Sequence, residues 1–308
     1  MANLIPERPL YRRERLIVGF PLLVAFALTL LARLLFDLLP LPALPELLKL
    51  LPMIAALLVP ALIFWMLRGG RYTRYMRFHA PRVTHLPFLI SSFFVLLSGS
   101  LLLSMLFGGT ETLGNSTVAF EAVHCDGPLD TVLKVLVTAV VPALTEELFF
   151  RGIVVTEYER RGAIRAVLMS ALTFSLCHFD LRNLPVYLFS GVLFALVLFA
   201  TDSLIATMLL HLCYNLFSLF GQQYLNAFYS ITGGVELFVF SLIVVLLLSL
   251  VIFCGLGSRI YHLREQGGRK DPRRSVPWNV QFYTILDALS DPPLLLCLVI
   301  SVVGFIVL

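Results

Sequence analysis

Two adjacent glutamates stand inside an apolar run, where a carboxylate is costly. The run VVPALTEELFFRGIVV extends from Val140 to Val155 and contains Glu146 and Glu147. A lipid-facing carboxylate at the centre of a bilayer costs roughly 2.5–3.5 kcal/mol or more, so these side chains must face the interior of the protein. On a helix, Arg151 lies one turn after Glu147 and can pair with it, while Glu146 points about 100° away. We therefore expect Glu146 to be the catalytic residue and Glu147 to be held by Arg151 as structural support.

Three more polar residues occur in otherwise apolar stretches. His178 ends the sequence FSLCH, and His211 and Asn215 begin and end HLCYN. The last two are one helical turn apart and face the same way. A single buried histidine most often satisfies a core hydrogen bond, but two histidines with a free glutamate and an asparagine suit attack of water on a carbonyl. The carboxylate and one imidazole would activate the water, and the other imidazole with the amide would stabilise the oxyanion.

Other chemistries are less well supported by the same segment. No serine or cysteine stands in a nucleophile context such as GxSxG, although Ser170, Ser175, Cys177 and Cys213 are close in sequence. Two histidines and a glutamate could bind zinc. However, the chain has no HExxH motif, and the three ligands would come from three separate helices. The sequence therefore predicts a metal-independent site without a cofactor.

The composition indicates which elements must position these residues. Of 308 residues, 59% are hydrophobic and only 14% are charged, which lies far outside the range of soluble domains. The net charge of +4 is modest and the basic residues form short clusters, so nucleic-acid binding is not expected. The five cysteines have no paired spacing that would indicate a disulfide framework. The chain is predicted to be an all-α polytopic membrane protein, in contact with the lipid bilayer.

Apolar runs of membrane-spanning length give the predicted helices. These runs are residues 16–36, 46–67, 86–107, 131–155, 165–180, 185–201, 203–220, 235–257 and 292–308. Because the fifth run is short and the last ends with the chain, eight to nine transmembrane helices are expected. The candidate residues fall on helices four, five and seven.

The same pattern divides the chain into three regions. Residues 1–130 hold three helices and an acidic outer loop, residues 131–220 hold the catalytic core, and residues 221–308 hold C-terminal helices with a basic cytoplasmic loop. Within the last region, residues 276–289 mix aromatic and polar side chains. This mixture suits a segment lying along the membrane interface as well as a plain linker.

Four clusters of basic residues fall on one side of the predicted membrane. They are Arg8, Arg12, Arg13 and Arg15; Arg68, Arg71, Arg74, Arg77 and Arg82; Arg160, Arg161 and Arg165; and Arg259, Arg264, Arg269, Lys270, Arg273 and Arg274. The loop at 108–130 has no Lys or Arg and carries Glu111, Glu121, Asp126 and Asp130. The excess of positive charge in cytoplasmic loops predicts a cytoplasmic N-terminus. The composition and short loops favour a bacterial plasma membrane.

Three short motifs carry a resemblance to a known family. They are EExxxR at residues 146–151, FxxxH at 174–178 and HxxxN at 211–215. In these motifs the chain resembles the type II CAAX prenyl endopeptidases and their bacterial CPBP (Abi) relatives, which are glutamate-dependent intramembrane proteases. Each motif alone is weak, but all three in order on separate helices form a strong signal. The resemblance covers about residues 131–220, and the C-terminal helix is additional to the family's usual eight-helix core.

The resemblance implies a role for each matching position. Glu146 and His178 would activate the water, and His211 with Asn215 would form the oxyanion hole. Glu147 and Arg151 would be the structural pair, and Phe174 is expected to pack rather than react. The expected substrate is a membrane-associated protein or peptide, such as one with a lipidated CAAX-like tail.

The depth of the reaction in the membrane follows from counting residues. Glu146 precedes Arg160, the first residue of the cluster Arg160, Arg161 and Arg165, by 14 residues, which corresponds to about 21 Å at the helical rise of about 1.5 Å. We therefore expect hydrolysis within or near the cytoplasmic half of the bilayer.

Two classes without protease activity remain as alternatives. Intramembrane Glu, Arg and His residues also build proton or ion pathways, so Glu146 or His178 could be the titrating group of a coupled transporter. The absence of an inverted repeat and the presence of a carbonyl-suited His and Asn pair disfavour this class. The other alternative is a membrane scaffold or bacteriocin-immunity protein that keeps the fold without catalysis.

Overall fold

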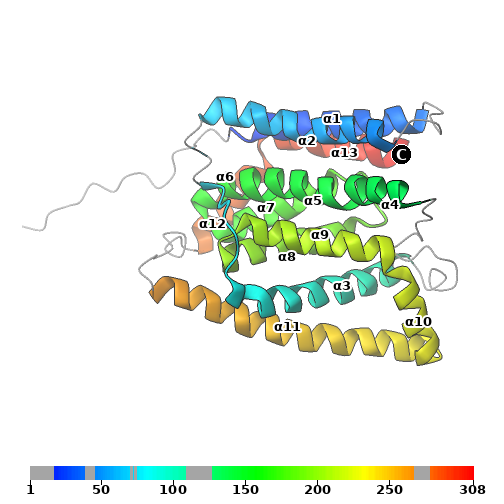
Figure 1. The fold of residues 1–308 in the computed structure, drawn as a ribbon. Coiled ribbons are helices and arrows are strands. Elements are labelled where there is room, and N and C mark those ends of the chain that lie inside the picture. Colours follow the sequence, from blue (N-terminus) through cyan, green and yellow to red (C-terminus); the bar gives the residue numbers. More distant parts are fainter. Residues whose placement is uncertain (1–16, 39–45, 70–71, 73–74, 109–126, 267–277) are drawn as a thin grey trace, which may run out of the picture.

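Every regular element in the part of the chain that can be described is helical. The computed structural model describes residues 17–38, 46–69, 72, 75–108, 127–266 and 278–308, and no strand occurs among them. The longer helices run side by side along one direction, as Figure 1 shows. The prediction of an all-α protein is confirmed for these residues.

The longer helices follow the predicted apolar runs. They are α1 (Gly19–Leu38), α2 (Glu46–Arg68), α3 (Leu86–Gly108), α7 (Ala163–Leu176), α8 (Leu184–Thr201), α9 (Leu204–Phe220), α11 (Val235–Gln266) and α13 (Pro292–Val307). The short helix η2 (Val83–His85) leads directly into α3. Two further helices, α10 (Gln222–Thr232) and α12 (Trp278–Leu289), lie outside the predicted spans. The helix α12 occupies the segment for which an interfacial position or a linker had been expected.

The predicted fourth span is one continuous helix that contains two π-helical segments. It consists of α4 (Pro128–Val135), η4 (Leu136–Val140), α5 (Val141–Glu146), η5 (Glu147–Val155) and α6 (Thr156–Tyr158), followed by the turn η6 (Glu159–Arg161). Both η4 and η5 are π-helical, and such stretches are frequent at functional sites. Pro142 has no N–H to bond the carbonyl four residues earlier, which accounts for the irregular turn before it.

The number of candidate membrane spans among the described residues is three to five. Three helices are long and apolar enough, namely Val83–Phe107, Leu184–Thr201 and Val235–Leu263. The number rises to five if α9 with α10, bent by 68°, and α12 with α13, bent by 58°, each form one span. The apolar parts of α1, α2 and α7 are shorter, and the fourth span is interrupted by its π-helical segments. The chain is thus an integral membrane protein by its helices, and eight to nine spans stay a prediction.

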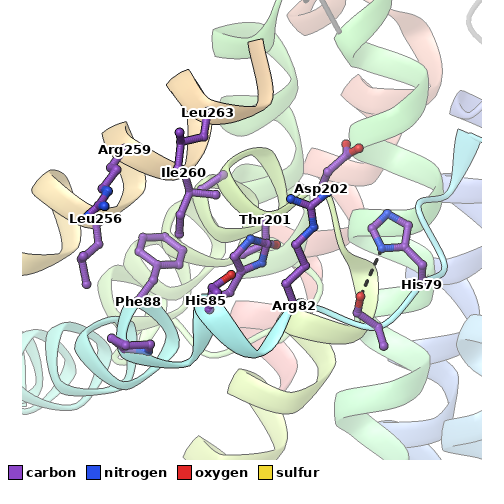
Figure 2. A pocket seen from close by; sticks show the side chains of 14 residues that line it. His79, Arg82, His85, Phe88, Thr201, Asp202, Leu256, Arg259, Ile260 and Leu263 are labelled. Atoms are coloured by element: carbon purple, nitrogen blue, oxygen red, sulfur yellow. Dashed lines mark hydrogen bonds between the residues drawn. The ribbon is translucent and has the colours of Figure 1, made fainter. Parts of the chain in front are cut away.

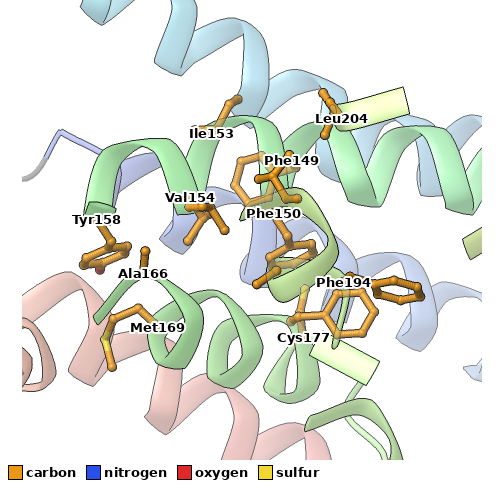
Figure 3. Packing of buried hydrophobic residues seen from close by; sticks show 14 of the residues in the cluster. Phe149, Phe150, Ile153, Val154, Tyr158, Ala166, Met169, Cys177, Phe194 and Leu204 are labelled. Atoms are coloured by element: carbon orange, nitrogen blue, oxygen red, sulfur yellow. The ribbon is translucent and has the colours of Figure 1, made fainter. Parts of the chain in front are cut away.

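The main hydrophobic core lies around η5. Phe149, Phe150 and Val154 of η5 pack with Met169 of α7 and Phe194 of α8, as Figure 3 shows. All five of these side chains are buried. The helix that carries the two glutamates is therefore fixed on several sides by apolar contacts.

The close approach of α7 and α8 depends on one glycine. A Cβ atom at Gly191 would lie 2.8 Å from the Cα atom of Ala171, a distance that real Cβ atoms do not adopt to backbone. Small residues at helix crossings let backbones approach closely in membrane proteins. Gly191 thereby keeps α8 against α7, and both helices contribute to the site described below.

Ion pairs join the helices at one end of the bundle. The buried Glu157 of α6 pairs with Arg68 at the end of α2 and accepts a 3.5 Å hydrogen bond from the hydroxyl of Tyr72. Burial and the Glu157 carboxylate raise the pKa of Tyr72, so this phenol stays protonated and donates. Arg77 binds Glu159 at 2.6 Å and Asp202 at 2.8 Å, which ties the segment before α3 to η6 and to the end of α8.

This end, on the left in Figure 1 near α6 and α12, carries the described members of the basic clusters. We call it the arginine-rich end. The helix α10 lies at the other end. The N-terminal cluster at 8–15, the basic residues at 269–274 and the acidic loop at 109–126 lie outside the described residues. A cytoplasmic N-terminus therefore stays a prediction.

Candidate active site

One cavity of about 280 Å³ is lined by all four residues expected to be catalytic. Its polar lining combines the end of α5, the turn after α7 and the middle of α9, so helix packing joins positions far apart in the sequence. The four residues are Glu146, His178, His211 and Asn215. The remaining lining residues are Thr138, Pro142, Phe174, Asn183, Val186, Tyr187, Ser190, Phe194, Tyr214 and Ser218.

The carboxylate of Glu146 lies between the two imidazoles. Its Oε2 atom is 3.9 Å from Nε2 of His178 and 3.9 Å from Nε2 of His211. These distances exceed a direct hydrogen bond. A water beside the line that joins the two atoms can still form hydrogen bonds with both of them. The carboxylate and either ring can therefore hold one water molecule between them.

The ring of His178 is fixed in orientation. Its Nδ1 atom lies 2.7 Å from the carbonyl oxygen of Phe174, to which it donates. In the neutral ring this leaves the lone pair on Nε2, the nitrogen that faces Glu146. The ring also stacks on Tyr187 with centroids 3.9 Å apart and planes inclined by 22°. His178 is thus prepared to accept a hydrogen bond in the cavity.

His178 does not lie on the helix that was expected to carry it. The helix α7 ends at Leu176, and His178 follows in a turn. The next residue, Phe179, has a left-handed backbone with φ of 49°. The hydrogen bond to the Phe174 carbonyl satisfies an end group of α7, so the same contact closes the helix and orients the ring.

His211 is oriented by the second glutamate. Its Nδ1 atom lies 2.9 Å from Oε1 of Glu147 and donates to it, since a carboxylate oxygen accepts. The ring stacks on Phe194 with centroids 4.7 Å apart and planes inclined by 23°. Its Nε2 atom consequently points to the side of the cavity where Glu146 lies.

The predicted ion pair lies behind the cavity wall. Arg151 Nη1 is 2.8 Å from Oε1 of Glu147, and neither side chain is exposed. Arg151 Nη2 donates to the carbonyl of Gly191 at 3.3 Å. Because the same carboxylate oxygen also accepts from His211, Glu147 does more than pair with Arg151. It connects the buried cation to an imidazole of the site.

Phe174 packs against the charged and imidazole groups, as expected. Its ring meets His178 and His211 edge-on, with centroids 4.7 Å and 6.2 Å away. The guanidinium of Arg151 lies over the same ring, 4.4 Å from its centroid. Cation–π contacts of this kind stabilise a buried arginine. Phe174 therefore maintains the spacing of the two rings.

Asn215 lies one turn after His211 on α9 and lines the same cavity. No hydrogen bond to its side-chain amide occurs among the described residues, whereas its backbone carbonyl accepts from Ser218 at 2.7 Å. The amide is therefore available to donate to a group bound in the cavity.

Two lining residues, Tyr187 and Asn183, were not recognised from the sequence. Tyr187 supports His178 by stacking, and Asn183 is held by Asp180, which accepts from its side chain at 2.8 Å and from its backbone N–H at 3.1 Å. Both residues stand near the beginning of an apolar run. Polar residues are common at the ends of helices, so these two did not stand out in the sequence. Their proximity in sequence to His178 was the only available signal.

The cavity extends away from the arginine-rich end. Ser218 lies near the last residue of α9, Asn183 lies just before α8, and Thr138 lies in η4 well before Glu146. The expectation of hydrolysis within or near the cytoplasmic half of the bilayer stays a prediction.

Within the described part of the chain, no group of three or more His, Cys, Asp or Glu residues is placed to hold a metal ion. The four described cysteines, Cys177, Cys213, Cys254 and Cys297, are unpaired.

Comparison with protein families gives one match. The model of the family described as Type II CAAX prenyl endopeptidase Rce1-like matches residues 128–217. This segment extends from α4 into α9 and contains all six residues of the three motifs that were predicted to form or support the site. The match confirms the resemblance and supports a membrane-embedded protease over this part of the chain. Comparison with curated proteins and with solved structures gave no match.

Proposed function

We propose that this chain, whose residues 128–217 match a family of CAAX prenyl endopeptidases, hydrolyses a peptide bond of a membrane-associated protein or peptide. The observation that carries the proposal is the placement of the Glu146 carboxylate 3.9 Å from Nε2 of both His178 and His211. A carboxylate and two imidazoles around a space of water size suit direct attack of water on a carbonyl.

In the first step, Glu146 acts as the general base. The water donates one hydrogen bond to Glu146 and a second to Nε2 of His178, which is free to accept because Nδ1–H is bound to the Phe174 carbonyl. The water oxygen then attacks the carbonyl carbon, and its proton passes to Glu146. This proton is next delivered to the amide nitrogen as the C–N bond breaks. No covalent enzyme intermediate is needed.

The attack of water places a negative charge on the carbonyl oxygen, and hydrogen-bond donors must stabilise this charge. His211 in its protonated form donates from Nε2, while its Nδ1–H remains bound to Glu147. The amide of Asn215, one turn away, is the second donor. Glu147 fixes the ring of His211 much as an orienting carboxylate fixes the base of a catalytic triad.

The substrate class follows from the site and from the family match. A cavity of about 280 Å³ accommodates a scissile bond and its neighbouring side chains, not a folded domain. The substrate therefore presents an extended segment at the membrane, and a lipidated CAAX-like tail is a candidate because of the match. The lining residues near the ends of α8 and α9 favour entry from the end opposite the arginines.

Comparative membrane peptidomics tests the proposal. Cells that carry Glu146→Ala or His178→Ala as the only copy should accumulate an uncleaved substrate that wild-type cells process. Glu236→Gln, on an exposed residue in the first turn of α11, serves as the control and should behave like the wild type. Unchanged processing in both site variants would contradict the proteolytic function.

The transporter alternative uses the same carboxylate and has a different readout. Proteoliposomes containing the purified chain should show no pH-dependent ion flux that Glu146→Gln abolishes. Such a flux, together with an unchanged peptide profile, would show that the chain is a transporter and not a protease.

A further inference from the structure

A second cavity of about 1070 Å³ lies at the arginine-rich end and shares no lining residue with the candidate active site. Figure 2 shows it between the segment that enters α3, the end of α8 and the last turns of α11. Its polar lining includes Arg82, His85, Asp202 and Arg259.

The charges around this cavity are predominantly positive. Arg82 and Arg259 line it, and neither has an ion pair or hydrogen bond to its guanidinium among the described residues. The single acidic lining residue, Asp202, is bound by Nε of Arg77 at 2.8 Å. The cavity therefore has two uncompensated cations and suits an anion.

A buried histidine lacks a partner in the same place. His85 is only 8% exposed, and its Nδ1 atom has no hydrogen-bond partner within the described structure. Buried polar atoms are nearly always satisfied, so this nitrogen is suited to a hydrogen bond with a group bound in the cavity. His85 also stands in the first turn of the helix Val83–Phe107, whose N-terminus is capped by no side chain. The positive end of this helix reinforces the preference for an anion.

The remaining wall is apolar and leads along α11. Leu256, Ile260 and Leu263 are spaced by four and three residues, so they form one face of α11 with Arg259 among them. Phe88 continues this wall, and it stacks on Phe253 with ring centroids 5.0 Å apart. The cavity thus combines a cationic part with an apolar strip beside it, which is the order of groups in an anionic lipid.

We propose that this cavity binds one anionic phospholipid from the leaflet at the arginine-rich end. The phosphate would lie between Arg82, Arg259 and Nδ1 of His85. An acyl chain would follow the strip of Leu256, Ile260 and Leu263, on a helix whose spanning part is only 22% buried and so faces lipid. The continuity of the strip with the lipid-facing surface favours a lipid over free phosphate. This inference is independent of the proposed peptidase activity.

Native mass spectrometry of the purified full-length chain in neutral detergent tests the lipid site. The probes are phosphatidylglycerol, phosphatidylcholine and inorganic phosphate, added separately. One phosphatidylglycerol should remain bound in preference to phosphatidylcholine. The double variant R82Q/R259Q should lower this affinity roughly thirtyfold, the effect of two basic charges near an anionic lipid surface.

Two further variants complete the experiment. Arg160→Gln removes an exposed arginine at the same end but outside the cavity, and it should bind phosphatidylglycerol like the wild type. Ile260→Trp fills the apolar strip without changing charge, and it should weaken lipid binding even if R82Q/R259Q folds poorly. Equal binding of both lipids, or binding unaffected by R82Q/R259Q and by Ile260→Trp, would overturn the proposal. Displacement of phosphatidylglycerol by millimolar phosphate would instead indicate a site for the free anion.

Discussion

The two neighbouring glutamates have different surroundings, and this difference suits them to different proposed tasks. The side chain of Glu147 is fully buried and binds both Arg151 and His211 through one oxygen. The side chain of Glu146 is 18% exposed, and its nearest described partners are imidazoles at 3.9 Å. A carboxylate without a tight partner can take up and release a proton, whereas a paired one orients its neighbours.

Replacing each glutamate by glutamine should separate these tasks. Glu147→Gln leaves Arg151 as an uncompensated buried charge, so it should lower the free energy of unfolding by about 3–5 kcal/mol and also reduce activity. Glu146→Gln should abolish activity with little change in stability. Thermal unfolding in detergent, measured beside peptide cleavage, checks both variants. Equal stability losses would show that Glu146 is also a structural residue.

Asn215 should act on the transition state alone. Asn215→Ala should lower kcat by about 10²–10³ with little change in KM, which is the usual effect of losing one oxyanion donor. Asn226→Ala, on the exposed surface of α10, is the matched control and should leave kcat unchanged. Kinetics with a cleaved peptide provide the measurement. A change confined to KM would assign Asn215 to substrate binding instead.

Hydrolysis by Glu146 and His178 requires no metal in the proposed reaction. Incubation with a strong chelator such as EDTA, followed by its removal, should therefore leave peptide cleavage unchanged. Loss of activity that added zinc restores would favour a zinc enzyme built on the same residues.

At the scale of elements, the C-terminal helix α13 supports the turn that carries His178. Gly304 lies against the ring of Phe179, the residue next to His178, so that a Cβ atom there would be 2.3 Å from Cδ1 of the ring. Ser301 of α13 donates to the carbonyl of Leu176 at 3.5 Å. The helix α13, which lies outside the matched segment 128–217, thus packs directly behind the site.

Gly304→Ala should therefore reduce both stability and activity. The added methyl must displace Phe179, with an expected cost of about 1–3 kcal/mol and a shift of His178 out of position. Gly255→Ala is the control, because no atom lies within 4 Å of the corresponding Cβ on α11. That change should be neutral or slightly stabilising, since alanine favours helix. Thermal unfolding and cleavage rates, measured for both variants, test these expectations.

At the scale of the whole molecule, the two cavities lie at different depths along the bundle. The lipid-suited cavity is at the arginine-rich end, and the candidate active site extends toward the end near α10. With the arginine-rich end in the cytoplasm, as the positive-inside rule predicts, we expect the substrate to reach the site from the opposite side.

Thiol labelling of a cysteine-free variant in spheroplasts tests this arrangement. A membrane-impermeant maleimide should label Gln223→Cys at the start of α10 and Ser218→Cys in the cavity without permeabilisation. Arg160→Cys, at the arginine-rich end, should react only after permeabilisation. Labelling of Ser218→Cys together with Arg160→Cys would place the opening on the cytoplasmic side.

The sequence alone determined the class of the molecule and indicated the candidate residues of its site. Apolar runs predict helices, because backbone groups in lipid must be satisfied within the segment. Polar residues in such runs, like Glu146 and His211, are conspicuous because they are costly there. The pairing of Glu147 with Arg151 also follows from spacing, since both lie on one helix.

Only the tertiary structure decided how residues on different helices meet. The bond from His211 to Glu147, the stacking of His178 on Tyr187 and the direction of the cavity depend on helix packing across long separations in sequence. Local periodicity carries no information about such contacts, because it fixes the face of one helix and not its neighbour. The end of α7 before His178 and the π stretch at Glu147 likewise result from packing, which overrides local propensity.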